Sequence, residues 1–259
     1  MSAGIQIPRR FNGPPESAHG GYACATAAEL LDCAAEVTLR APPPIERELT
    51  VERSGDEAVT LRDGEVVVIE ARRATAQVDV PEPVTLAEAE AAAAACPWLD
   101  HHPFPTCFGC GPQRAVGDGM REFPGPVASR PGIWATPWIP DVSLADESGE
   151  IRPLFTFAAL DCPSAAGAIE AGGVSMFDQV HVLARLTGEV LAPVRAGEPQ
   201  VVMSWPIRSE GRKCYGAVAV FTGDRVVAAG EALWIALQDP DRFGAATTGR
   251  AAAGGNPRA

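Results

Sequence analysis

The sequence lacks long hydrophobic runs and lacks an excess of positive charge. No apolar stretch approaches the roughly 20 residues that a membrane-spanning helix needs, so we expect no membrane span. The net charge of −12 argues against nucleic acid as a partner, because phosphate binding needs a basic surface. Residues 1–10 lack the apolar core of a secretory signal, which favours the cytoplasm.

The cysteines are odd in number and unevenly spread. Seven cysteines in a chain without a recognisable signal favour reduced thiols over a disulfide framework. A hydrophobic fraction of 46% and a charged fraction of 21% are typical of a globular protein with a packed core. At 259 residues the chain is long enough for one large domain or two of ordinary size.

The most informative motif is His19-Gly20-Gly21, which lies just before a segment of small and apolar helix formers at residues 23–31. A turn with two glycines that opens a helix leaves the first backbone N–H groups pointing outward, at the positive end of the helix dipole. Such groups suit a carbonyl oxygen that gains negative charge, and glycine lets a ligand reach the backbone. The simpler interpretation is a helix start in which the glycines make the turn and the histidine is incidental.

Two segments share one order of predicted elements, a helix followed by antiparallel strands. Apolar alternation and the hairpin signal Asp63-Gly64 carry this prediction. The first segment has a predicted helix at 20–34 and strands at 36–41, 47–53, 58–62 and 65–74. The second has a predicted helix at 158–171 and strands at 180–190, 200–208, 213–221 and 225–237. The repeated order favours a duplication, with shorter strands or a trimmed hairpin in the first segment, although unrelated meanders also resemble one another.

The chain between these segments is predicted to be irregular except for one helix. Residues 83–95 are rich in alanine and glutamate, and Thr85 with Glu88 indicates a capping box. Residues 96–112 are too rich in proline for regular structure, and residues 132–140 hold a further strand. The chain is therefore divided into an N-terminal unit (1–82), a helical and Pro/Cys-rich linker (83–131), a C-terminal unit (132–243) and a disordered tail (244–259).

Three stretches together carry a resemblance to a known family. Asn12-x(6)-His19-Gly20-Gly21, the segment 158–167 and the segment 211–221 resemble the two-repeat, double hotdog proteins of the acyl-CoA thioesterase-like group. The resemblance covers roughly residues 10–237. It implies an α+β fold of two tandem hotdog units, each a long helix wrapped by an antiparallel sheet, which form a pseudo-dimer in one chain. It also implies hydrolysis of acyl-CoA or another acyl thioester.

The resemblance implies an acidic residue on or near a central helix as base or nucleophile, and Asp161 best matches that role. The residues themselves leave a helix cap open for Asp161, because Pro163 fits the first turn of a helix. His19 is a candidate base, a donor to substrate or a cap. Asn12 either contacts the carbonyl or water, or makes a turn with Gly13. The predicted catalytic residues are thus Asp161 and His19, and the predicted substrate-binding residues are Asn12, Gly20, Gly21 and Tyr22.

Departures from the family keep two other functions open. Related two-repeat thioesterases place an Asp, a Gln and a Ser or Thr around water, and neither Gln179 nor Thr187 matches those roles convincingly. A non-catalytic acyl-CoA or lipid-binding protein would keep the fold and lose the base. A hotdog hydratase or dehydratase usually carries Asp-x(4)-His on the central helix, and neither Asp161 nor Asp32 has a histidine five residues on.

The remaining polar residues indicate weaker possibilities. Cys107-Phe-Gly-Cys110, downstream of His101 and His102, resembles half a zinc site, but one Cys-x-x-Cys is too few ligands, so we expect a packed loop with no metal or cofactor. Cys162 is either a nucleophile near His181 or a buried thiol, and the buried thiol is favoured. Glu29 is expected to face solvent. Cations available for the phosphates of coenzyme A are Arg40, Arg72, Arg73, Arg208, Arg212 and Lys213. A homo-oligomer is compatible with the sequence.

Overall fold

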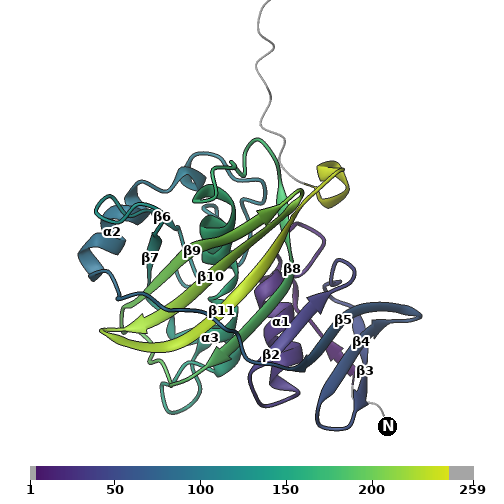
Figure 1. Ribbon diagram of the computed structural model, residues 1–259. Coiled ribbons are helices and arrows are strands. Elements are labelled where there is room, and N and C mark those ends of the chain that lie inside the picture. Colours follow the sequence, from purple (N-terminus) through teal and green to yellow (C-terminus); the bar gives the residue numbers. More distant parts are fainter. Residues whose placement is uncertain (1–3, 245–259) are drawn as a thin grey trace, which may run out of the picture.

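The computed structural model describes residues 4–244, and these form one antiparallel sheet with helices on both faces (Figure 1). The predicted tail therefore lies outside the described residues, apart from Gly244. The order of strands across the sheet is β1-β3-β4-β5-β2-β8-β11-β10-β9-β7-β6. The strands are β1 (Gly4–Gln6), β2 (Ala35–Leu39), β3 (Glu48–Ser54), β4 (Ala58–Asp63), β5 (Val66–Arg73), β6 (Gly125–Pro126), β7 (Trp134–Trp138), β8 (His181–Val190), β9 (Gln200–Glu210), β10 (Lys213–Thr222) and β11 (Arg225–Ala236).

The centre of the sheet is a seam between β2 and β8, where Val37 is the Cα partner of Leu186. Outward from this seam the order is β2-β5-β4-β3-β1 on one side and β8-β11-β10-β9-β7 on the other. The predicted antiparallel strands are thus confirmed. Strands β2–β5 have 5–8 residues and β8–β11 have 10–12, so the first half does have the shorter strands.

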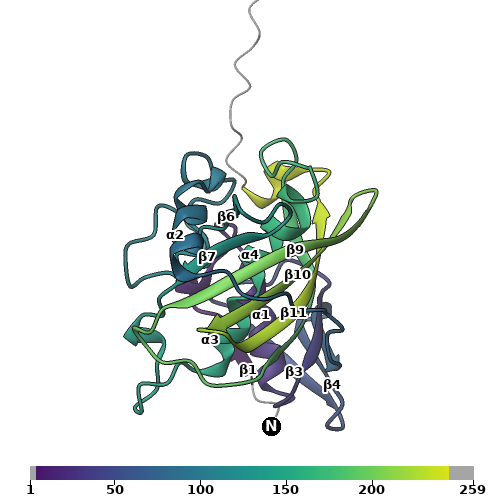
Figure 2. The same ribbon diagram turned by 60° about the vertical axis from the view of Figure 1, so that its left-hand side comes forward.

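The central helical layer lies against one face of the sheet, with α1 and α3 close together in both ribbon views (Figures 1 and 2) and with α4 next to α1 in Figure 2. It consists of α1 (Gly20–Glu29), α3 (Pro153–Ala158), α4 (Asp161–Ala165) and a π-helical turn, η4 (Ala166–Glu170). The predicted helix at 20–34 is too long, because the backbone enters the left-handed region at Asp32 (φ 50°) soon after α1 ends. The predicted start of the second central helix at residue 158 is also wrong, because helical backbone already begins at Pro153.

A second helix layer covers the opposite face near one end of the sheet. Helix α2 (Leu86–Ala94) begins at the predicted capping box, in which the Thr85 hydroxyl accepts from the Glu88 amide. Val201 and Met203 of β9 pack in the small core beneath α2, whereas Val202 between them belongs to the main core. The predicted linker is therefore folded onto the sheet. The short 3₁₀ helices are η1 (Arg9–Phe11), η2 (Pro97–Leu99), η3 (Val142–Leu144) and η5 (Pro240–Phe243).

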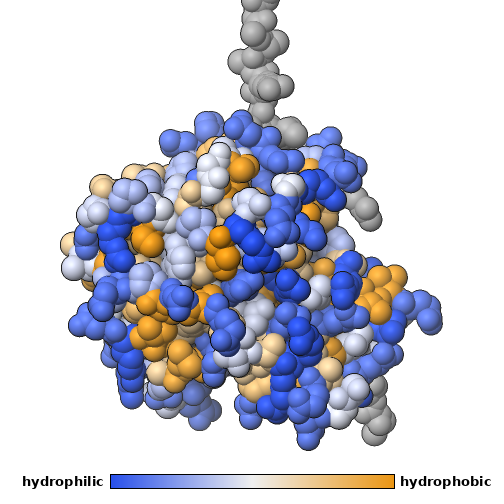
Figure 3. All heavy atoms as spheres, viewed as in Figure 1, coloured by the Kyte–Doolittle hydropathy of each residue, from blue (hydrophilic) through white to orange (hydrophobic). Residues whose placement is uncertain are grey.

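The face of the molecule that Figure 3 shows is predominantly hydrophilic, with hydrophobic residues in small separate groups. Among the described residues, the most exposed large apolar side chains belong to four separate segments of the chain: Val66, Val116, Ile139 with Val142, and Leu191. Within residues 4–244, no helix combines the length and apolar character that a bilayer crossing requires.

Gly216 marks a close approach between the sheet and the central helices. A Cβ at this position would lie 2.7 Å from the Ala168 nitrogen and 2.7 Å from the Ser164 oxygen, both backbone atoms. Gly216→Ala is therefore expected to lower the free energy of unfolding by about 1–3 kcal/mol, the usual cost of overpacking. Urea unfolding measures this change. The exposed variant Ser209→Ala serves as control and should stay within about 0.5 kcal/mol of the parent; equal stability of both variants would contradict the packing.

Candidate active site

The amino end of α1 meets the junction of α3 and α4, which brings His19 and Asp161 together. One carboxylate oxygen of Asp161, Oδ2, accepts from the Gly21 amide at 2.5 Å and lies 3.0 Å from Nε2 of His19. Both side chains are only 2% exposed. Two residues that are 142 positions apart in the chain, each predicted as catalytic, thus form one buried contact between the start of α1 and the start of α4.

The backbone sets the tautomer of His19. Its Nδ1 accepts from the Tyr22 amide at 3.2 Å, which makes His19 the N-cap of α1. A ring nitrogen that accepts from an N–H carries no proton, so the proton of the neutral ring is on Nε2. Burial lowers the pKa of His19, the Asp161 carboxylate raises it, and the net shift is upward. His19 therefore presents a donor to Asp161.

Asp161 caps the helix of the other half of the chain. No hydrogen bond from its side chain caps its own helix, because helical backbone already starts at Pro153. Its bond to the Gly21 amide instead supplies an acceptor at the start of α1. The alternative of an N-cap in its own helix, which Pro163 suggested, is thereby corrected.

The predicted substrate-binding residues separate into two groups. Gly20 lines the main cavity, and within residues 4–244 its amide has no hydrogen-bond acceptor. The amides of Gly21 and Tyr22 are already bound, by Asp161 and His19 respectively. Asn12 lies outside the cavity lining, where its side chain accepts from Arg114 and donates to the Gly13 carbonyl. The ring of Tyr22 stacks on Phe11 at 3.9 Å.

The cavity beside His19 and Asp161 has a volume of about 270 Å³ and mainly apolar walls. Trp98, Met176 and Leu183 contribute to those walls. Asp161 lines the same cavity, and its second oxygen, Oδ1, is buried without a hydrogen-bond partner in the described part of the chain. An unpartnered carboxylate oxygen beside an apolar cavity can accept a proton from a bound water.

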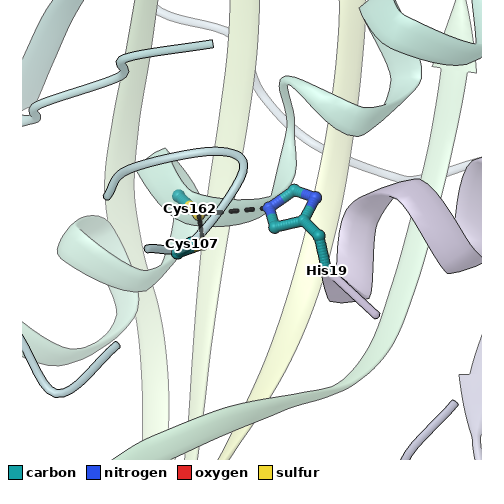
Figure 4. Close-up of side chains that lie close together, drawn as sticks. All are labelled: His19, Cys107 and Cys162. Atoms are coloured by element: carbon teal, nitrogen blue, oxygen red, sulfur yellow. Dashed lines mark hydrogen bonds between the residues drawn. The ribbon is translucent and has the colours of Figure 1, made fainter. Parts of the chain in front are cut away.

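Three cysteines gather next to this pair, an arrangement that the sequence interpretation missed. Cys162 Sγ lies 3.2 Å from Nε2 of His19 and 3.8 Å from Cys107 Sγ, and Figure 4 shows the side chains of His19, Cys107 and Cys162 pointing toward one another. Hydrogen bonds from Cys110 and Cys162 hold the pKa of the Cys107 thiol well below its ordinary value. The expected neighbour of Cys162, His181, lies beside Cys214 instead.

The loop that carries Cys107 and Cys110 folds over the start of α1. The Phe108 amide donates to the Asn12 carbonyl at 2.7 Å, and the Met120 amide donates back to the Phe108 carbonyl at 2.8 Å. A Cβ on Gly109 would lie 2.6 Å from both Cys162 Sγ and His19 Nε2, so only glycine allows this approach. The loop at residues 107–110, which was predicted to be packed, therefore covers His19 and Cys162.

Two further acidic residues are placed by the structure. Glu29 is exposed, as expected, and pairs with Arg152 at 3.2 Å. Glu122, which the sequence analysis did not single out, is fully buried, and neither of its carboxyl oxygens has a hydrogen-bond partner among residues 4–244. Burial, followed by the charges of Asp161 and Cys107, raises its pKa well above the ordinary value. No local sequence signal distinguishes this glutamate from a solvated one.

Comparisons with known proteins identify the fold. No family model matches the chain, and no curated protein matches its sequence. Among solved structures, a TesB protein of Mycobacterium avium subspecies paratuberculosis matches with a TM-score of 0.57 and 13% identity, over 90% of this chain and 91% of that one. A protein from Novosphingobium aromaticivorans named for thioesterase activity has a TM-score of 0.55 and 15% identity, over 90% and 94%.

A third structure, named as an oleoyl thioesterase from Lactobacillus plantarum, has a TM-score of 0.53 and 10% identity, over 92% of this chain and 96% of that one. At such identities the likeness concerns the fold, which all three share with this chain nearly end to end. The resemblance to thioesterase-like hotdog proteins is thus confirmed at the level of the fold.

Proposed function

We propose that this protein hydrolyses acyl thioesters and that it consists of two hotdog units, residues 1–82 and 132–243, joined by the folded linker 83–131. The matching strand order on the two sides of the β2–β8 seam supports the tandem arrangement. The observation that carries the enzymatic function is the carboxylate of Asp161. One oxygen is held by the Gly21 amide and His19, the other is buried without a hydrogen-bond partner among residues 4–244, and Asp161 lines an apolar cavity.

In this mechanism Asp161 is the general base and His19 is a positioning residue. Oδ1 of Asp161 removes a proton from a water that attacks the thioester carbonyl, while the bonds at Oδ2 keep the carboxylate in place. His19 is unsuited to be the base, because its Nδ1 already accepts from Tyr22 and its Nε2 carries the proton. The Gly20 amide, which has no acceptor among residues 4–244, donates to the carbonyl oxygen as negative charge develops there.

The cavity has features that suit both the acyl chain and the phosphates of an acyl-CoA. Its apolar walls suit the acyl chain. Of the six cations available for the phosphates of coenzyme A, Arg40 is the one that lines the cavity, and it is exposed. Arg40 also pairs with Glu70 at 2.5 Å, so a phosphate would compete with that carboxylate for the guanidinium. Coenzyme A is therefore the carrier proposed here.

Steady-state hydrolysis of an acyl-CoA panel, from acetyl to palmitoyl, tests the function. Release of free coenzyme A is followed with a thiol reagent, and the acid product is identified by chromatography. Turnover with saturation supports the thioesterase. Saturable binding of acyl-CoA without release of coenzyme A would instead support the non-catalytic acyl-binding protein and overturn the proposed function.

Filling the cavity is expected to select against long acyl chains. Ala184 lines the cavity from β8, so Ala184→Phe places an aromatic ring in the space that the acyl chain would occupy. We expect kcat/KM for palmitoyl-CoA to fall at least about tenfold, with a smaller change for acetyl-CoA. The matched control is Ala87→Phe on the exposed side of α2. Equal losses for short and long substrates would show that the acyl chain binds elsewhere.

A further inference from the structure

The sulfurs of Cys107 and Cys162 lie next to each other where the loop over His19 meets α4. They are 3.8 Å apart, within hydrogen-bonding distance for sulfur, and the two side chains point toward each other (Figure 4). Cys107 belongs to the covering loop, whereas Cys162 is in the first turn of α4, 55 residues further along the chain. Both are free thiols. The pair therefore joins two segments that no sequence motif connects.

The close approach of the loop to Cys162 depends on Gly109. A Cβ at this position would lie 2.6 Å from Cys162 Sγ, so glycine lets the loop backbone settle against this sulfur. Cys110 belongs to the same loop, but its sulfur lies 3.1 Å from Nε2 of His102. The Cys-x-x-Cys spacing by itself suggests a disulfide within the loop, whereas the sulfur–sulfur contact in the structure runs from the loop to the helix.

The cavity gives small molecules access to both sulfurs. Cys107 and Cys162 line it, although the two residues are only 5% and 4% exposed. Arg40 and Pro42 line the same cavity and are exposed, so it extends from the thiols to the surface. Its volume of about 270 Å³ admits a small oxidant. Access of this kind favours a hydroperoxide over the disulfide of another protein.

The two thiols differ in how readily they lose a proton. Hydrogen bonds from the neighbouring thiols of Cys110 and Cys162 lower the pKa of Cys107 well below its ordinary value. The hydrogen bond with Cys107 is the largest of the causes that raise the pKa of Cys162. With Cys107 as the thiolate, the S–H of Cys162 donates to it across the 3.8 Å contact. The thiolate is the nucleophilic form, so Cys107 is the sulfur that reacts first.

We propose that Cys107 and Cys162 form a site of reversible oxidation, at which a hydroperoxide converts the two thiols to a disulfide between the loop and α4. An S–S bond of about 2 Å requires the sulfurs to approach from their present separation, and rotation about the Cα–Cβ bonds moves them by the required amount. The inference goes beyond the proposed hydrolysis and does not depend on it.

The oxidation has two steps. The thiolate of Cys107 attacks the terminal oxygen of the hydroperoxide and the O–O bond breaks. The leaving alkoxide, or hydroxide in the case of hydrogen peroxide, takes a proton from solvent, and Cys107 becomes a sulfenic acid. The sulfur of Cys162 then attacks the Cys107 sulfur, and the sulfenic oxygen leaves as water with the proton of Cys162. The two electrons that the sulfurs lose reduce the hydroperoxide.

Thiol mapping of the reduced full-length protein after treatment with one equivalent of hydrogen peroxide tests the site. The remaining thiols are alkylated, and the protein is digested with trypsin without reduction. We expect two of the seven thiols to escape alkylation. A cross-link should join peptide 74–114 to peptide 122–185, in which Cys162 is the only cysteine, and fragmentation should place its other end at Cys107. Dithiothreitol should restore both thiols. A missing cross-link, or a disulfide from Cys107 to Cys110 in its place, would overturn the proposal without bearing on hydrolysis.

Variants assign the two roles. Cys162→Ser keeps the attacking sulfur and removes the second thiol, so the reaction should stop at a sulfenic acid on Cys107 that dimedone traps. Cys107→Ser should lose both products. Cys214→Ser, which removes a buried cysteine beside His181 outside the pair, should form the cross-link as the wild type does.

Circular dichroism checks that each variant is folded, and the wild-type mapping decides the proposal if a serine variant is not. Dimedone labelling of Cys162 in folded Cys107→Ser, with no labelling of Cys107 in folded Cys162→Ser, would overturn the assignment of Cys107 as the attacking thiolate.

Discussion

Asp161→Asn is expected to lower kcat for acyl-CoA hydrolysis by about 10²- to 10⁴-fold, the range that a general base contributes. An amide cannot take the proton of the attacking water. Its oxygen can still accept from the Gly21 amide, so the contact that joins α1 to the α3–α4 junction is kept. KM and the unfolding midpoint should therefore change little. Steady-state kinetics with the best substrate of the panel, together with thermal unfolding, measure both expectations.

His19→Asn is the matched variant for this prediction. Asparagine is among the best N-cap residues, so it replaces the acceptor for the Tyr22 amide while it removes the Nε2–H donor to Asp161. A positioning residue of this kind should cost less than the base, about tenfold in kcat. A loss in His19→Asn as large as that in Asp161→Asn would assign proton transfer to the histidine. Asp161→Asn activity within a few-fold of wild type would remove Asp161 from the mechanism.

The fold was largely predictable because its elements carry local periodic signals. Strands β3–β5 and β8–β11 alternate or are continuously apolar, and the Asp63-Gly64 turn and the Thr85 cap lie where their residue types predict them. The errors concern the ends of helices. The end of α1 depends on the backbone conformation at Asp32, and the start of α3 at Pro153 was missed because the Ala-rich run at 158–171 gave the stronger helical signal.

The sequence singles out His19 and Asp161 as candidates but does not predict the contact between them. The composition around His19 and Asp161 indicates chemistry, but their contact, like that of His19 with Cys162 across 143 residues, depends on how the halves dock. The Cys107-Phe-Gly-Cys110 motif likewise gives no sign that Cys162 of α4 lies 3.8 Å from Cys107. Gly21 illustrates the same difficulty. The sequence predicts that glycine here lets a substrate reach the backbone, whereas in the structure Gly21 packs against Asp161.

Gly21→Ala is expected to damage both stability and activity, because the structure gives this glycine a packing role. A Cβ there would lie 2.5 Å from Cβ of Asp161 and 2.7 Å from the backbone oxygen of Ala158, so α1 and the α3–α4 junction must separate. We expect a loss near the upper end of about 1–3 kcal/mol in the free energy of unfolding. A displacement of Asp161 by a fraction of an ångström to one ångström should also lower kcat about 10²-fold. Urea unfolding and steady-state kinetics measure the two effects.

Gly20→Ala is the neighbouring comparison. Its Cβ would meet the side chain of Leu183 at 2.9 Å and Oδ2 of Asp161 at 3.2 Å, contacts that side-chain rotation relieves more easily than a clash with backbone. Gly20→Ala should therefore be the more stable of the two variants. If Gly21→Ala instead unfolds at the wild-type urea concentration while Gly20→Ala is impaired, the glycine that matters is the one beside the cavity. The predicted role of these glycines in admitting a carbonyl would then take precedence over the contact with Asp161.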